Sequence, residues 1–139
     1  MQQRERGFSG WYLRLGAGSL VAALGLAALG YVPTVRLAGP EAAGAMVAGI
    51  AASLAAGLVG AVPLARAAGS TAERLPLAVM TATALRFLVV AALAASVILS
   101  GWFDRVVVAV WIGVSYMAML FVDALIALSI VHAVRGQQT

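Results

Sequence analysis

Two residues of opposite charge, Arg86 and Asp123, lie inside otherwise apolar stretches of this chain. Their surroundings, ALRFLVV and LFVDALI, contain no other charged residue. A charged side chain near the centre of a lipid bilayer costs at least about 2.5–3.5 kcal/mol, so it usually has a partner or a function. The guanidinium group of an arginine can donate several hydrogen bonds to a carboxylate. The pattern indicates either an ion pair within the chain or a charge that contacts a partner outside it.

The elements that carry these two charges are membrane-spanning helices. The chain has 139 residues, of which 63% are hydrophobic and 10% charged, whereas soluble domains average about 25% charged residues. Four apolar stretches exceed the roughly 18 residues that indicate a transmembrane helix. We therefore predict an all-α membrane protein, a four-helix transmembrane bundle that occupies residues 1–139 as a single domain. The expected spans are about 13–32, 42–64, 75–99 and 106–131.

The segments between the spans are short. Pro33–Glu41 (PTVRLAGPE) and Ser100–Arg105 (SGWFDR) are predicted to be turns. Short connections make successive helices antiparallel neighbours. Arg86 would then lie about 16 Å, and Asp123 about 13–14 Å, from the same membrane surface, at 1.5 Å per residue. An internal ion pair is geometrically natural, and contact of one charge with a partner remains the alternative.

The distribution of arginines predicts the orientation. The side that holds both termini and the loop between the second and third spans carries six arginines, and the other side carries two. The positive-inside rule then places both termini in the cytoplasm. The basic residues are all arginines and the chain is rich in Ala and Gly, which suggests a bacterial protein of the inner (plasma) membrane. The six are Arg4, Arg6, Arg14, Arg66, Arg74 and Arg135, and the two are Arg36 and Arg105.

The second span repeats a small residue at every fourth position, which creates one narrow helix face. Such faces allow close approach of another helix. The face either packs within the bundle or docks another membrane subunit. Its serine is expected to bond back to its own helix backbone. The residues of this helix-packing face are Ala45, Gly49, Ser53, Gly57 and Ala61.

Other polar residues of the spans are few. Thr83 lies three residues before Arg86, and Tyr116 seven before Asp123, so either can extend a polar network around the two charges. His132 is the one histidine, there is no cysteine, and no phosphate-binding loop or serine-nucleophile motif occurs. We expect no catalytic residue, metal site, cofactor or nucleic-acid partner, and therefore no enzyme activity.

The sequence resembles ATP synthase subunit I and its relatives linked to Na⁺-type ATPases. The resemblance covers roughly Leu15–Val131 and is carried by the four-span layout, by GAMVAGIAASLAAGLVGAVPLAR in the second span and by ERLPLAVMTATALRFLVVAALAA in the third. It implies that Arg86 faces a carboxylate of the rotor-ring c subunit. The chain departs from the family in having Leu64 after Pro63 and in having Asp123.

The resemblance favours an accessory or assembly protein of a membrane complex, most concretely one that assembles or stabilises the c ring of an F-type ATP synthase by helix–helix contact. The expected partners are membrane lipids, other membrane subunits such as the c subunit, and further copies of the chain. Two alternatives stay open. One is a small ion transporter or channel subunit, for example for Mg²⁺. The other is a permanent structural subunit of a respiratory or photosynthetic complex.

Overall fold

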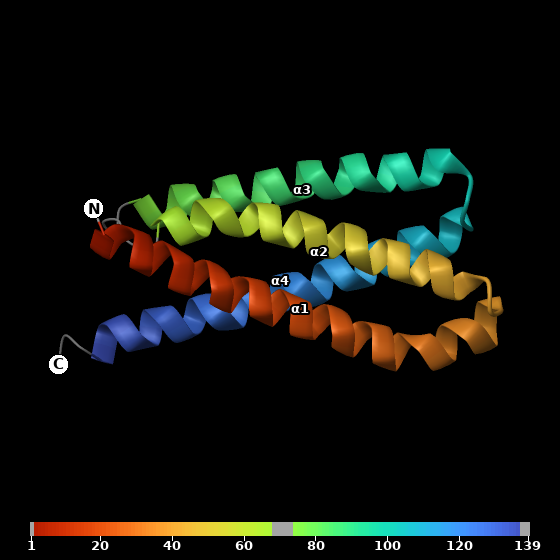
Figure 1. Cartoon of the computed structure of the whole chain (residues 1–139), viewed down its shortest axis with the longest axis horizontal. Coiled ribbons are helices and arrows are strands. Elements are labelled where there is room, and N and C mark those ends of the chain that lie inside the picture. The colour runs from red at the N-terminus through yellow and green to blue at the C-terminus, as the bar shows by residue number, and fades with distance from the viewer. Residues whose placement is uncertain (1, 68–73, 137–139) are drawn as a thin grey trace.

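The structure is a computed structural model that describes the backbone of residues 2–67 and 74–136 and the side chains of residues 9–66, 74, 76–126 and 128. It is a bundle of four long helices, as Figure 1 shows. The predicted fold class is confirmed. The helices are α1 (Gln2–Ala38), α2 (Ala42–Ala67), α3 (Leu75–Ser100) and α4 (Arg105–Gly136).

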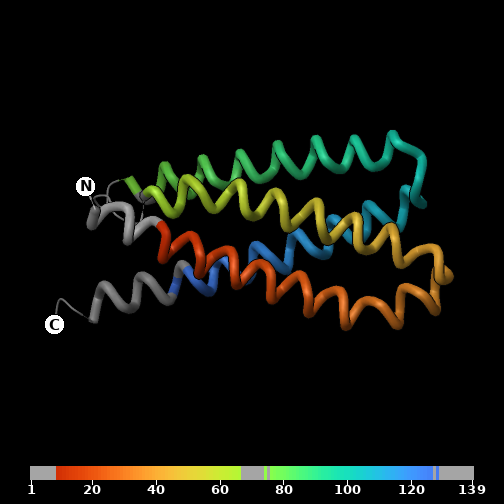
Figure 2. The backbone as a smooth tube through the Cα atoms, viewed as in Figure 1, coloured from red at the N-terminus to blue at the C-terminus, as the bar shows by residue number. Residues whose placement is uncertain are grey.

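Helix α2 is the centre of the bundle. It packs against each of the other three helices, whereas α3 and α4 contact each other least among the packed pairs. The most apolar stretch of α2 is 56% buried, against 22% for α1 and 17% each for α3 and α4. The backbone trace in Figure 2 shows α3 and α4 joined at one end of the bundle and separating toward the other. The outer faces of α1, α3 and α4 are therefore open to lipid or to other proteins.

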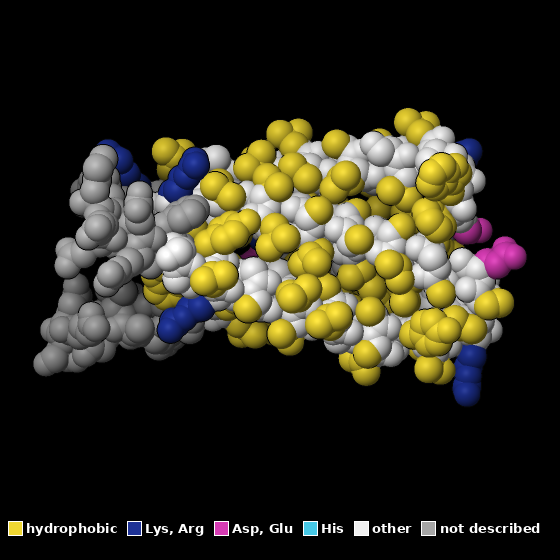
Figure 3. Space-filling view, viewed as in Figure 1, with side chains coloured by type: hydrophobic (Ala, Val, Ile, Leu, Met, Phe, Trp, Pro, Cys, Tyr) yellow, Lys and Arg dark blue, Asp and Glu magenta, His cyan; other side chains and the backbone are white. Residues whose placement is uncertain are grey.

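All four helices are long and apolar enough to cross a membrane. Large apolar side chains such as Leu29, Phe87 and Leu99 are exposed on the outside of the bundle. Figure 3 shows apolar side chains along the length of the bundle and basic side chains near its two ends. The start of α1 and the end of α4 lie at the same end of the bundle (Figure 1). The structure therefore describes a multi-pass membrane protein.

Helix α1 is longer than the first predicted span at both ends. It begins at Gln2 and continues through Pro33 to Ala38, so the predicted turn from Pro33 was wrong for residues 33–38. A proline removes one backbone donor, and membrane helices tolerate this because neighbouring groups satisfy the freed carbonyl. The chain turns where Gly39 adopts φ +87°, a left-handed conformation that glycine accommodates without steric cost.

The predicted turn between the third and fourth spans is confirmed, and its ends have clear causes. Gly101 terminates α3 in the left-handed conformation, with φ 70°. Asp104 then caps α4, because its Oδ1 accepts hydrogen bonds from the backbone N–H groups of Val106 (2.8 Å) and Val107 (3.1 Å). Such a cap satisfies donors that the first helical turn leaves unpaired.

The small-residue face of α2 lies inside the bundle. A Cβ atom on Gly49 would come within 2.9 Å of Trp111 Cβ and 3.1 Å of Ile112 N, so α2 and α4 approach to backbone contact there. The face therefore packs the bundle internally and is not open to a further subunit. Its five members, Ala45, Gly49, Ser53, Gly57 and Ala61, are all buried.

Candidate functional site

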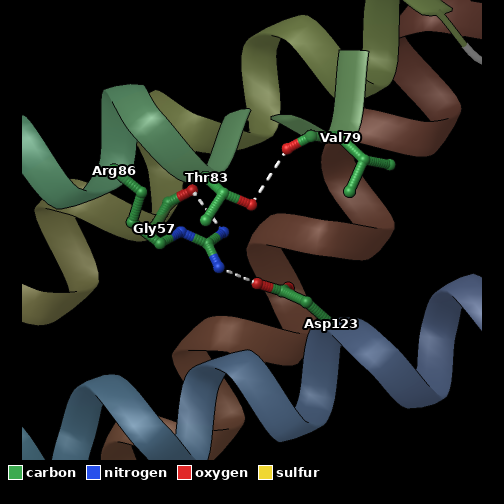
Figure 4. A network of polar contacts seen from close by, with 5 residues as sticks. All are labelled: Gly57, Val79, Thr83, Arg86 and Asp123. Atoms are coloured by element: carbon green, nitrogen blue, oxygen red, sulfur yellow. Dashed lines mark hydrogen bonds and ion pairs between the residues drawn. The ribbon is translucent and has the colours of Figure 1, made fainter. Parts of the chain in front are cut away.

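Arg86 of α3 and Asp123 of α4 form an ion pair across the bundle (Figure 4), in which Arg86 Nη1 donates to Asp123 Oδ2. The internal pair expected from the sequence is thus present. Arg86 is 14 residues, or about 21 Å, from the end of α3, and Asp123 is 18 residues, or about 27 Å, from the start of α4. The long arginine side chain and the crossing of the helices accommodate this offset.

Helix α2 supplies a third partner. Arg86 Nη2 donates to the backbone carbonyl of Gly57 at 3.3 Å. A carbonyl oxygen has two lone pairs, so it can accept this bond in addition to one within its own helix. The guanidinium group therefore links α3 to α4 through Asp123 and to α2 through Gly57. Sequence reasoning singled out Gly57 only for packing, because a backbone acceptor leaves no signal in residue type.

Two glycines of α2 lie beside Arg86, and Gly60 is the one that makes room for it. A Cβ atom on Gly60 would lie 3.1 Å from each of Arg86 Cβ, Arg86 Nε and the carbonyl oxygen of Ala82. A Cβ atom on Gly57 would lie 4.0 Å from Arg86 Nη2 and 3.6 Å from Met119 Sδ. Any side chain at position 60 would press α3 away from α2 and shift the guanidinium group. Gly60 lies off the predicted packing face, and its role was missed.

The two candidates for a wider polar network do not join the pair. The hydroxyl of Thr83 is exposed and donates to the carbonyl of Val79 at 2.9 Å, back along α3. Tyr116 is half-buried, and within the described side chains no hydrogen bond connects it to Arg86 or Asp123. The polar contacts of the pair are therefore with each other and with Gly57.

Buried serines lie elsewhere in the interior. Ser53 Oγ donates to the carbonyl of Ile112 at 3.3 Å, so the expectation that Ser53 bonds to its own helix was wrong. The close approach of α2 and α4 brings a carbonyl of the neighbouring helix within reach. Ser115 is fully buried, and its Oγ has no hydrogen-bond partner among the described residues. Ser19 of α1 is also buried.

The fold and the site define a four-helix membrane bundle with a buried ion pair between α3 and α4. Among the described residues, no group of three or more His, Cys, Asp or Glu side chains is arranged to hold a metal ion. Comparisons of the chain with models of protein families, with curated proteins and with solved structures gave no match. The relationship to ATP synthase subunit I stays a hypothesis based on the resemblance.

Proposed function

We propose that this chain is a non-enzymatic accessory or assembly subunit of a membrane protein complex and acts through helix–helix contact within the bilayer. The observation that carries the proposal is the division between the inner and outer faces of α3. Its inner face holds Arg86, which is bonded to Asp123 and Gly57. Its outer face exposes large apolar side chains, among them Leu77, Met80, Phe87 and Leu88.

This division suits a protein that presents a surface to other helices. The ion pair adds a link between α3 and α4, the packed helices with least mutual contact, while α3 packs most extensively against α2. A helix fixed in this way offers a stable apolar face to a neighbour in the membrane. Association of membrane helices relies on packing and interhelical hydrogen bonds, because lipid is itself apolar.

The concrete partner that we propose, from the resemblance, is the c ring of an F-type ATP synthase in a bacterial inner membrane, with both termini of the present chain in the cytoplasm. The burial of Arg86 limits how it could contact the c subunit. Arg86 is 4% exposed, so it would reach a c-subunit carboxylate only after the bond to Asp123 opened. Contact through the outer faces of the helices needs no such opening.

A divalent-cation path has less support. Such paths are built from several oxygen ligands. Asp123 is the single acidic residue within the four predicted spans, and its carboxylate is already bonded to Arg86.

The proposal is tested in the organism that encodes the chain. The gene is deleted, and the amount of assembled c ring in the membranes is measured on native gels and by quantitative mass spectrometry. We expect less assembled c ring in the deletion strain and recovery with the wild-type gene. A second arm purifies a tagged chain in mild detergent and quantifies the c subunit that accompanies it.

The matched control is Gly25→Ala, since a Cβ atom there would meet nothing within 4 Å. It should restore c-ring assembly as the wild type does. Unchanged c-ring levels in the deletion strain, together with no c subunit above the level of an untagged control, would contradict the ATP synthase assignment. Retention with a different membrane complex would identify another partner.

A further inference from the structure

The two members of the ion pair are not equally enclosed. The side chain of Arg86 is 5% exposed and that of Asp123 is 13% exposed. Each nitrogen of the guanidinium group lies inside the bundle. Nη1 bonds Asp123, Nη2 bonds the carbonyl of Gly57, and Nε is buried against Gly60 without a hydrogen-bond partner among the described residues.

One oxygen of the Asp123 carboxylate, Oδ1, has no hydrogen-bond donor among the described residues. Its Oδ2 accepts from Arg86, and its Oδ1 receives no hydrogen bond from the described part of the chain, yet is not sealed inside as Arg86 Nε and Ser115 Oγ are. An ionised carboxylate can accept about four hydrogen bonds. In lipid there is little water to supply the missing donors. The member of the pair that can take a further bond is therefore the carboxylate.

The ion pair lies between two helices that share little surface with each other. The ion pair bridges α3 and α4, the packed helices with least mutual contact, and Figure 4 shows Arg86 and Asp123 meeting in the space between these two helices. Large exposed side chains lie on both helices nearby, with Phe87 on α3 at 62% and Phe121 on α4 at 65%. A further helix could pack here and bring a polar side chain to Asp123.

We propose that Asp123 is the recognition point for a partner transmembrane helix that carries a hydrogen-bond donor, either a basic or an amide side chain, at the depth of the ion pair. The donor bonds Asp123 Oδ1 while Arg86 keeps Oδ2. This rests on the proposed function and names the chemistry of the partner. The resemblance implies a partner with a carboxylate, whereas this proposal names a partner with a hydrogen-bond donor. A partner carboxylate would be repelled by the like charge of Asp123, and Arg86 is too enclosed to bind it.

The test uses the full chain, purified and placed in phosphatidylcholine nanodiscs, with synthetic transmembrane probes. Each probe is a Leu/Ala helix of about 20 residues with one guest residue near its middle: Arg, Gln, Glu or Leu. Energy transfer between labelled probe and labelled chain gives the affinity. Interhelical hydrogen bonds in membranes predict that the Arg and Gln probes bind about threefold to tenfold more tightly than the Leu probe. The Glu probe should not exceed the Leu probe.

Two variants make the result specific. Asp123→Asn keeps an oxygen acceptor but loses the charge, so the preference for the Arg probe should fall while that for the Gln probe persists. The double substitution Arg86→Asp with Asp123→Arg keeps an ion pair but places the positive charge on α4. This variant should bind the Glu probe more tightly than the Arg probe. Where this double variant does not fold, the comparison of the four probes on the wild-type chain decides.

Tightest binding of the Glu probe by the wild type, equal binding of all four probes, or an Arg preference unchanged by Asp123→Asn would each overturn the proposal. These failures are separable from those of the proposed function. Retention of the chain in a native complex, combined with no preference among the probes, would refute the recognition point alone. A clear donor preference without retention in any complex would refute the accessory role alone.

Discussion

Gly60 lies directly against Arg86: a Cβ atom at position 60 would come within 3.1 Å of both the Cβ and the Nε of the arginine. The central helix thus carries a glycine where the one buried cation of the described spans must fit. The ion pair and the close packing of α2 against α3 therefore depend on the same position.

Gly60→Ala should destabilise the bundle, because both the arginine and the carbonyl of Ala82 would have to shift. Overpacking of a well-filled interior typically costs about 1–3 kcal/mol. The free energy of unfolding in an SDS titration, followed by circular dichroism, measures the effect. Gly25→Ala is the control, as it adds a methyl group in open space and should be neutral or slightly stabilising, since alanine favours helix by up to about 1 kcal/mol. Equal stability of the two variants would show that Gly60 does not limit the approach of α3.

Removal of one member of the ion pair should be far more damaging than removal of both. Arg86→Met leaves Asp123 without its cation, and breaking a buried pair in this way typically costs about 3–5 kcal/mol. The double substitution Arg86→Met with Asp123→Leu removes both charges and should recover most of that loss, because apolar replacements of similar volume are often neutral or stabilising. The same SDS titration applied to both single variants and the double variant measures the coupling. Additive losses in the double variant would mean that the two side chains do not interact in the membrane.

Orientation can be tested with single cysteines, because the natural chain contains none. The positive-inside rule predicts that the turn between α3 and α4 faces outward and that the C-terminus is cytoplasmic. In intact spheroplasts a membrane-impermeant maleimide should label Trp102→Cys, at a side chain that is 84% exposed. Gln138→Cys should be labelled only after permeabilisation. The opposite labelling pattern would reverse the assigned topology.

The sequence determined the architecture because its signals are long and strong. Four apolar runs predicted four spans, and the structure has four helices at those places. The pairing of Arg86 with Asp123 followed from antiparallel neighbours at similar depth. The extension of α1 through Pro33 was not foreseen, since proline is a reliable helix terminator in water but not in a membrane helix, where the chain instead turned at Gly39.

The sequence could not predict the hydrogen bond to Gly57 or the unequal exposure of the two charged side chains, for a different reason. The carbonyl of Gly57 is a backbone group that every residue type offers, so only the three-dimensional approach of α3 identifies it as the acceptor for Arg86. The unequal exposure of Arg86 and Asp123 likewise depends on helix crossing. Similar depths predicted contact between the two charges but did not show that the second oxygen of Asp123 lacks a donor among the described residues.

Two buried serines, Ser53 of α2 and Ser115 of α4, should respond differently to substitution by alanine. Ser53→Ala deletes the hydrogen bond to the carbonyl of Ile112, which should cost about 0.6 kcal/mol, the average for interhelical bonds in a membrane protein. Ser115→Ala deletes a fully buried hydroxyl that has no partner among the described residues. An unsatisfied buried polar group is unfavourable, so this variant should be neutral or more stable than the wild type. Both substitutions remove one oxygen from a side chain of the same size, so each is the control for the other in the SDS titration. A loss of stability in Ser115→Ala as large as that in Ser53→Ala would mean that the Ser115 hydroxyl has a bonding partner in the membrane.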